Sequence, residues 1–124
     1  MILGTGIDIV EVHRIAEKIA KGQGFREMVF SSSEIAYCEK QGHPEQHYAA
    51  RFAAKEALFK ALGSGWLNGT AFDEIEIAHD AKGQPNLQLK GQTAETLAKF
   101  QISRIHVSLS HQASMATAIV ILEN

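Results

Sequence analysis

Residues 51–63 read Arg-Phe-Ala-Ala-Lys-Glu-Ala-Leu-Phe-Lys-Ala-Leu-Gly, and they form the clearest helical pattern in the chain. Large apolar side chains recur at helical spacing from Tyr48 to Leu62, and alanines stand between them. Gly63 stands where the C-cap of a helix is expected. Because alanine side chains are small, other elements can approach such a helix closely. We therefore expect a long helix that ends at Gly63 and is closely packed by its neighbours.

Hydrophobic periodicity and turn residues predict the other elements. Gly4 and Gly6 interrupt a short β-rich opening segment, and Ser31 and Glu34 have the spacing of a helix capping box. We expect strands at residues 1–8, 75–79, 87–90, 105–110 and 115–122, and helices at 12–19, from Ser31 to the closing Gly42 and Pro44, at 48–62 and at 93–101. The sum is an α+β fold of one domain, residues 1–124, with helices gathered on one face of a mainly antiparallel sheet.

The composition limits the function classes. The formal net charge of −2 gives no global positive field, which argues against general nucleic-acid binding, so any polyanion must meet a local cluster. The single cysteine, Cys38, allows neither an internal disulfide nor a zinc cluster. Apolar runs such as residues 116–122 are too short to span a bilayer, and the N-terminus has no signal-peptide pattern. We expect a cytoplasmic protein without a membrane partner, and a homo-oligomer because so small a domain leaves apolar surface uncovered.

Asp8 is the first candidate for chemistry. It lies in the apolar run Gly6-Ile7-Asp8-Ile9-Val10, where the opening strand gives way to a helix. A buried carboxylate is costly unless it is paired or binds a metal, so metal binding is one interpretation. The other interpretation is an N-cap for the helix that follows.

The long helix carries charged residues on two flanks of its apolar stripe. Glu56 and Lys60 are four residues apart on one flank, and Arg51 and Lys55 are four apart on the other. The simplest interpretation of the Glu56–Lys60 pair is an exposed ion pair. The alternative is a phosphate site, in which three cations near one carboxylate act with the backbone N–H groups of Gly63-Ser64-Gly65.

Two further patterns have both a structural and a functional interpretation. His106, Ser108 and Ser110 share one face of the late strand, with His111 at the turn, and they are either a solvent-facing polar row or ligand contacts. The first helix carries a basic stripe that is either a solvated face or a docking surface for an acidic partner helix. This basic stripe and its extension consist of Arg14, Lys18, Lys21, Phe25 and Arg26.

Three blocks of the chain together closely resemble the holo-acyl-carrier-protein synthase family of the 4'-phosphopantetheinyl transferase superfamily. They are Gly6-Ile7-Asp8-Ile9-Val10-Glu11-Val12, Arg51-Phe52-Ala53-Ala54-Lys55-Glu56-Ala57 with Lys60-Ala61-Leu62-Gly63, and Ser108-Leu109-Ser110-His111. The segment from Phe30 to Glu34 is similar to the family's Phe-Ser/Thr-x-x-Glu element. The order, the spacing and the total length agree, so the resemblance spans nearly the whole chain.

The resemblance implies a 4'-phosphopantetheinyl transferase-like fold, a homotrimer and active sites where two subunits meet. It implies an enzyme of fatty acid biosynthesis that uses Mg²⁺ to move phosphopantetheine from coenzyme A to a serine of apo-acyl carrier protein, with release of adenosine 3',5'-bisphosphate. Magnesium suits this chemistry because it prefers oxygen ligands and typically takes one or two carboxylates plus substrate phosphates. The proton acceptor stays open between Glu56 and a metal-bound water.

The same resemblance assigns roles by position. Asp8 and Glu56 match the family's metal ligands, and together with Lys60, which matches the lysine on the coenzyme A pyrophosphate, they are the expected catalytic residues. The other expected coenzyme A contacts are Arg51, Lys55, Gly63, Gly83, Pro85, Ser110 and His111, with Gly83 and Pro85 on a loop that reaches the adenine from the neighbouring subunit. The basic first helix, with Arg14, matches the surface that receives the acidic helix of acyl carrier protein.

Two positions depart from the family pattern. An acidic residue often follows the late Ser-His pair in the family and an aromatic residue stands a little further on, where this chain has Gln112 and Met115.

Two other functions compete with phosphopantetheine transfer. A metal-dependent phosphodiesterase would use the same carboxylates to hydrolyse a nucleotide without a protein acceptor. A non-catalytic carrier-protein or nucleotide-binding module would bind without adding mass to the carrier.

Overall fold

A computed structural model describes all 124 residues of the chain. Five strands, five α-helices and two short 3₁₀ helices follow one another along the chain. In order, they are β1 (Ile2–Glu11), α1 (Val12–Ala20), α2 (Phe25–Val29), α3 (Ser32–Glu39), α4 (Pro44–Leu62), η1 (Phe72–Glu74), β2 (Ile75–His79), β3 (Pro85–Leu89), α5 (Gly91–Leu97), η2 (Ala98–Phe100), β4 (Arg104–His111) and β5 (Met115–Glu123). None of these helices has the length and apolar character needed to cross a membrane.

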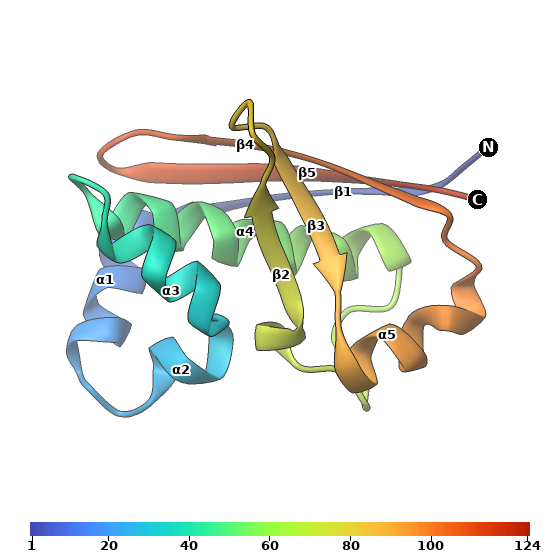
Figure 1. Cartoon of the computed structure of the whole chain (residues 1–124), viewed down its shortest axis with the longest axis horizontal. Helices are drawn as coiled ribbons and strands as arrows, with labels where there is room; N and C mark the ends of the chain where they lie inside the picture. Colours follow the sequence, from blue (N-terminus) through green and yellow to red (C-terminus); the bar gives the residue numbers. More distant parts are fainter.

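The main sheet is antiparallel, with β5 between β1 and β4. Its register sets Asp8 opposite Ala118, and Ser110 opposite Thr117. The alternation expected for the late strand is confirmed, because Ile105, Val107 and Leu109 of β4 are partly buried while their neighbours are exposed. Figure 1 shows this sheet as one layer along the molecule, with α4 running beneath it.

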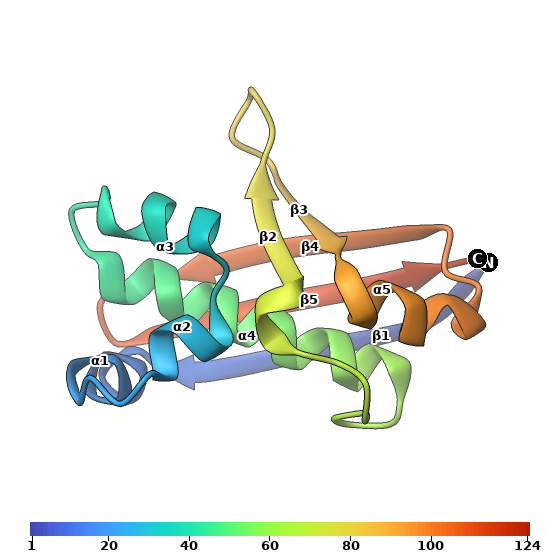
Figure 2. The same cartoon turned by 60° about the horizontal axis from the view of Figure 1, so that its bottom comes forward.

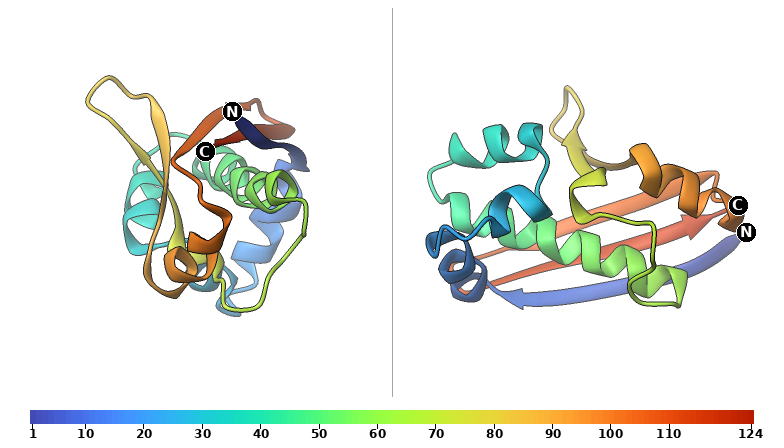
Figure 3. Two further views of the ribbon diagram at one scale, coloured as in Figure 1. Left: turned by 90° about the vertical axis from the view of Figure 1, so that its right-hand side faces the viewer. Right: turned by 90° about the horizontal axis from the view of Figure 1, so that it is seen from below.

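Helix α4 is the long helix that the sequence predicts, and it lies between the sheet and the remaining elements (Figure 3). Pro44 occupies its first turn, where the missing N–H is harmless, so this proline begins α4 rather than only closing the helix before it. Gly63 is the expected C-cap, with a left-handed φ of 77°. Five alanines of the helix are almost completely buried, namely Ala49, Ala50, Ala53, Ala54 and Ala57.

The close approach of β1 to α4 depends on two glycines. A Cβ atom placed on Gly6 would lie 2.0 Å from the carbonyl oxygen of Ala57, and one on Gly4 would lie 2.0 Å from that of Ala61. Any side chain at these positions would therefore push the strand away from the helix. Because successive strand residues face opposite sides, Gly4, Gly6 and Asp8 all face α4.

The remaining elements pack on the far side of α4. The structure differs from two expectations, one about the number of sheets and one about the end of β1. β2 and β3 form a separate two-stranded sheet, so the chain has two antiparallel sheets rather than one. Figure 2 shows this hairpin rising across α4 beside α3. β1 runs to Glu11, beyond the expected end at residue 8, because all of residues 4–11 pair with β5. The capping box of Ser31 and Glu34 is confirmed at the start of α3.

The outer face of the main sheet is apolar and uncovered. Ile7 and Ile9 of β1 are each 63% exposed, and Ile119 of β5 is 38% exposed beside them. These three isoleucines lie on the face that points away from α4. Contiguous apolar patches of this kind mark interaction surfaces more often than free surfaces.

We predict that Gly6→Ala lowers the stability of the fold by about 2–3 kcal/mol, and the melting temperature by roughly 10 °C, because the new methyl group overlaps a backbone oxygen that cannot move away. Thermal unfolding followed by circular dichroism measures the change. Gly42→Ala is the matched control, since a Cβ atom at Gly42 meets nothing within 4 Å. Equal melting temperatures for the two variants would contradict the close approach.

Candidate active site

Asp8 lies in the middle of β1 and contacts the helix beneath it. Its Oδ1 accepts a hydrogen bond from Lys60 Nζ at 2.8 Å, and the same ammonium group donates to the carbonyl oxygen of Ile7 at 3.0 Å. The Asp8 side chain is only 14% exposed. The N-cap interpretation is wrong, because Glu11 precedes α1 and no side chain caps that helix. The strand thus presents Asp8 to the residues of α4.

Glu56 is partly buried and close to Asp8 in the same corner. Burial raises its pKa above the ordinary value, and the charge of Asp8 raises it further, while Lys60 and Lys18 oppose these effects. Glu56 and Lys60 make no direct ion pair, so the simple helical pair expected as one alternative is wrong: Lys60 pairs with Asp8 instead. Two carboxylates held together against their repulsion, beside one ammonium group, form what we call the carboxylate corner.

The carboxylate corner fits a hard divalent cation. Its donors are all oxygens, and the repulsion between Asp8 and Glu56 is what a cation between them would relieve. No group of three or more His, Cys, Asp or Glu side chains is arranged so that it could hold a metal ion by itself. Two carboxylates are nevertheless the protein share that Mg²⁺ typically takes, because water and substrate phosphates complete its shell.

Lys55 does not face the carboxylate corner, and its expected contact with coenzyme A is wrong. Its side chain is fully buried, and its ammonium group has three partners: the carboxylate of Glu34 at 2.6 Å and the carbonyl oxygens of Val29 and Phe72 at 2.8 Å. Glu34 also accepts from the backbone N–H of Ile77. This buried ion pair joins α2, α3, η1 and β2 to α4, so Lys55 is a structural residue.

Arg51 lines a separate pocket of about 210 Å³ on the hairpin side of α4. Four expected contact residues meet there, since Gly83, Pro85 and His111 line the pocket together with Arg51. Tyr37, His47 and His79 line it as well. We call this cavity the arginine pocket.

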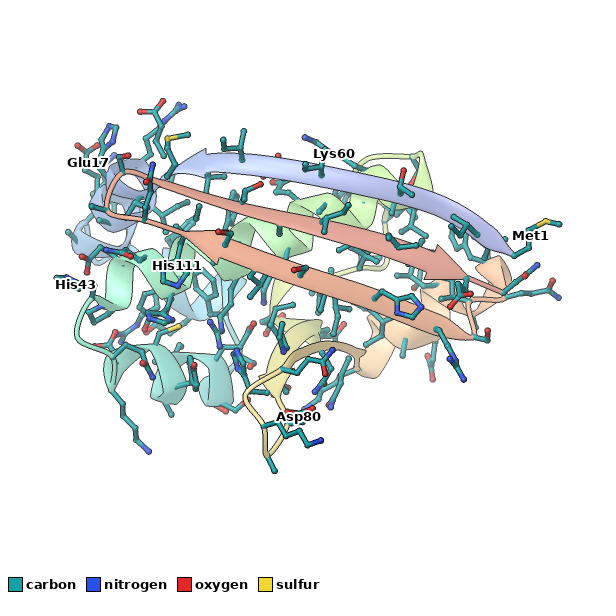
Figure 4. All side chains as sticks on the ribbon, turned by 90° about the horizontal axis from the view of Figure 1, so that it is seen from above. Met1, Glu17, His43, Lys60, Asp80 and His111 are labelled. Carbon is teal, nitrogen blue, oxygen red and sulfur yellow. The ribbon has the colours of Figure 1, made fainter.

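The arginine pocket and the carboxylate corner lie on opposite sides of α4. Lys60 follows Arg51 by nine residues, which corresponds to about 180° of rotation at 3.6 residues per turn. Figure 4 agrees with this: Lys60 lies at the β1 edge of the main sheet, whereas His111 and Asp80 lie toward the β4 edge. Arg51 therefore cannot join Lys60 around a single phosphate within one chain, so the expected cluster of three cations around one carboxylate is not formed.

The late Ser-His segment joins the arginine pocket to the outer end of the sheet. Ser110 is exposed and lines a neighbouring cavity with Gln112 and Met115, and His111 borders both cavities. His111 Nδ1 donates to Gln46 Oε1 at 2.9 Å. The two residues that depart from the family pattern thus lie beside Ser110, and Met115 also lines a groove with Arg14 and Lys18 of α1.

The basic stripe of α1 is exposed and borders the carboxylate corner. Arg14 and Lys18 line a groove with Ile9, and Lys18 is near enough to Glu56 to lower its pKa. Lys18 Nζ also lies 5.5 Å from the ring centre of Phe25 on α2. The expected surface is therefore continuous over α1 and α2.

Two details of this surface differ from the expectation. The Arg26 guanidinium is paired with Glu27 at 2.8 Å and Glu39 at 3.5 Å, so it adds little net charge. Met28 is 66% exposed on α2, the helix that extends this surface, and it is not among the residues expected from the sequence. Met28 stands between Glu27 and Val29 in a helix of five residues, so no pattern in the sequence marks it.

Comparison with known proteins shows which family the chain belongs to. A family model described as the 4'-phosphopantetheinyl transferase superfamily matches residues 4–120. A holo-[acyl-carrier-protein] synthase of Syntrophus aciditrophicus is 48% identical over 99% of this chain and 97% of its own length. The chain belongs to the 4'-phosphopantetheinyl transferase superfamily. The family expected from the sequence is confirmed, and the chain is an enzyme of this superfamily.

Solved structures of phosphopantetheinyl transferases confirm the α+β fold with antiparallel sheets. The holo-[acyl-carrier-protein] synthase of Neisseria meningitidis has a TM-score of 0.90 and 36% identity, with all of both chains covered. The enzyme of Helicobacter pylori, solved in complex with coenzyme A, has a TM-score of 0.83 and 33% identity over 96% of this chain and 99% of its own.

Proposed function

We propose that the chain transfers the 4'-phosphopantetheine group of coenzyme A to a serine of apo-acyl carrier protein, with Mg²⁺ at Asp8 and Glu56. The carboxylate corner is the observation that carries this proposal, because it gathers two carboxylates and a lysine from distant parts of the sequence. The name of the Syntrophus relative and the coenzyme A complex of the Helicobacter enzyme support the same substrates.

The residues of the carboxylate corner have different roles in phosphoryl transfer. The serine hydroxyl attacks the phosphorus that carries the pantetheine, the bond to the adenylate phosphate breaks, and adenosine 3',5'-bisphosphate leaves. Mg²⁺ on Asp8 and Glu56, when bound, neutralises charge on the pyrophosphate oxygens. Lys60 supplies a further positive charge and is 55% exposed, so it can reach the substrate. A carboxylate oxygen of Glu56 that the metal leaves free would accept the serine proton.

We assign the adenosine end of coenzyme A to the arginine pocket of a neighbouring copy. The arginine pocket and the corner of one chain lie on opposite sides of α4, so one ligand reaches both kinds of site only where two copies meet. The apolar outer face of the main sheet, with Ile7, Ile9 and Ile119 exposed, is a surface that such a copy would cover. We therefore propose a homotrimer with an active site at each subunit interface, closed by cyclic symmetry.

The acidic helix of the carrier protein is assigned to the basic surface of α1 and α2. Arg14, Lys18 and Lys21 are exposed there, and Met28 adds an apolar contact. Lys18 links this surface to Glu56, so a carrier bound here delivers its serine near the carboxylate corner. Opposite charge over such a surface steers association as well as binding.

We predict that Asp8→Asn and Glu56→Gln each reduce Mg²⁺-dependent transfer by about 100-fold or more, because one metal ligand contributes several kcal/mol to the transition state. Intact-protein mass spectrometry of apo-carrier incubated with enzyme, coenzyme A and Mg²⁺ measures the added phosphopantetheine, and EDTA should abolish it. Glu95→Gln, an exposed carboxylate on α5, is the control and should keep full activity. Near-normal transfer by both variants, with the fold intact, would rule out the metal assignment.

We predict that Glu56→Gln, which lacks a metal ligand, and Arg51→Gln, which binds coenzyme A weakly, restore about one quarter of wild-type activity when they are co-expressed in equal amounts and assayed at a coenzyme A concentration at which each is nearly inactive alone, because one interface in four then combines intact residues from both chains. The same mass assay reads the activity, and sedimentation counts the chains in the oligomer. Thermal unfolding of each variant is the control for folding. If the mixture stays inactive although mixed oligomers form, each active site lies within one chain.

We predict that the double variant Arg14→Glu, Lys18→Glu raises the KM for carrier protein at least tenfold and changes the KM for coenzyme A by less than twofold, because only the carrier surface is reversed in charge. Steady-state kinetics with each substrate varied gives the two constants. Lys40→Glu, an exposed cation outside this surface, is the matched control. An equal loss for both substrates would count against docking on α1.

A further inference from the structure

Arg51 is a buried cation that has no acidic partner. Only 1% of the residue is exposed, and it takes part in none of the ion pairs of the structure. Its Nε is the one buried side-chain nitrogen or oxygen without a hydrogen-bond partner. Lys55, one turn along α4, is equally buried but pairs with Glu34. Since a buried charge is costly without a counter-charge, Arg51 is arranged for an anion that comes from outside the chain.

Two side chains hold the Arg51 guanidinium from different elements. Its central carbon lies 4.3 Å from the ring centre of Tyr37 on α3. Its Nη2 donates to Nδ1 of His79, at the end of β2, over 3.2 Å. The rings of Tyr37 and His79 are themselves stacked, with centres 4.6 Å apart and planes 12° apart. The three side chains form one unit between α3, α4 and the hairpin, which we call the Tyr37–Arg51–His79 unit.

His79 has to be neutral to take part in this unit. A guanidinium group has only donors, so Nδ1 of His79 is the acceptor and carries no hydrogen. Burial lowers the pKa of His79, and the charge of Arg51 lowers it further, against the raising effect of Asp80. A neutral ring keeps Arg51 in place and leaves its positive charge uncompensated.

The arginine pocket suits a small anion with several oxygens. The arginine pocket has a volume of about 210 Å³, which is too small for a whole nucleotide. It presents a guanidinium group and three histidines to one charged group. The fork of donors on a guanidinium group matches the oxygens of a phosphate or a carboxylate. On the proposed function, the pyrophosphate of coenzyme A is held at the carboxylate corner, so its ribose 3'-phosphate is the group that remains.

We propose that Tyr37 and His79 are positioning residues that hold Arg51 for the 3'-phosphate of coenzyme A, and so set the preference for coenzyme A over dephospho-coenzyme A. The inference rests on the proposed function, since it concerns the same ligand. His79 and Tyr37 act through Arg51 and take no part in the transfer step at the carboxylate corner. Their loss should therefore weaken binding of the one substrate that has the 3'-phosphate.

The test compares two substrates in four variants. His79→Ala and Tyr37→Leu remove the acceptor and the aromatic face, whereas His79→Asn keeps an acceptor amide and Tyr37→Phe keeps the ring. For His79→Ala and Tyr37→Leu we expect kcat/KM with coenzyme A to fall about tenfold, through KM, with kcat changed by less than twofold. With dephospho-coenzyme A, kcat/KM should stay unchanged. His79→Asn and Tyr37→Phe should remain within about threefold of the wild type with both substrates.

Three outcomes would overturn the proposal: equal losses with both substrates, no loss with coenzyme A, or a wild-type enzyme that does not prefer coenzyme A. The proposed function fails by a different result, namely that the wild type adds phosphopantetheine to the carrier from neither substrate. In that case calorimetry with adenosine 3',5'-bisphosphate and with AMP still tests the pocket, because only the first ligand carries the 3'-phosphate. Tighter binding of the first ligand that is lost in His79→Ala supports the role of His79, and equal binding of both ligands rejects it.

Discussion

The backbone contact between β1 and α4 is the constraint on which the carboxylate corner depends. Gly4 and Gly6 have no side chains to separate the strand from the carbonyl oxygens of Ala61 and Ala57. Asp8 follows Gly6 on the same face of β1, so the contact that seats the strand also brings its carboxylate to Lys60. A strand held one side chain further away would leave Asp8 out of reach of α4. Packing of the smallest residues thus fixes the distance between groups that are 48 or more positions apart in sequence.

The two flanks of α4 then serve different purposes because of its helical repeat. Glu56 and Lys60 share the flank that meets β1, while Arg51 points to the hairpin and α3. Lys55 faces the inside of the molecule, where its pairing with Glu34 ties four elements to the helix. One segment of ten residues therefore supplies the flank of the carboxylate corner, a structural ion pair and the flank of the arginine pocket, each set by an angle of about 100° per residue.

Local patterns in the sequence predict the elements well, and long-range contacts limit the rest. The capping box of Ser31 and the C-cap at Gly63 depend on neighbours within four residues, and both are confirmed. The split into two sheets depends on which strands pair, which periodicity does not encode. Helical spacing put Lys55 beside Arg51, yet the burial of Lys55 follows from Glu34, Val29 and Phe72, and nothing local marks them as its partners. The resemblance to a family supplied Asp8 and Glu56, where spacing alone favoured an N-cap and an exposed ion pair.

The contrast between Lys55 and Arg51 shows how the fold distinguishes a structural charge from a functional one. Both cations are buried on the same helix, and burial costs each of them solvation. Lys55 has its compensation within the chain, as a carboxylate and two carbonyl oxygens, so no ligand is needed to complete it. Arg51 has an aromatic face, a neutral ring nitrogen and a backbone oxygen, which orient the guanidinium without cancelling its charge. A cation that is oriented but not neutralised has most to gain from an incoming anion, and for that reason the proposed phosphate contact lies in the arginine pocket rather than at the better-satisfied Lys55.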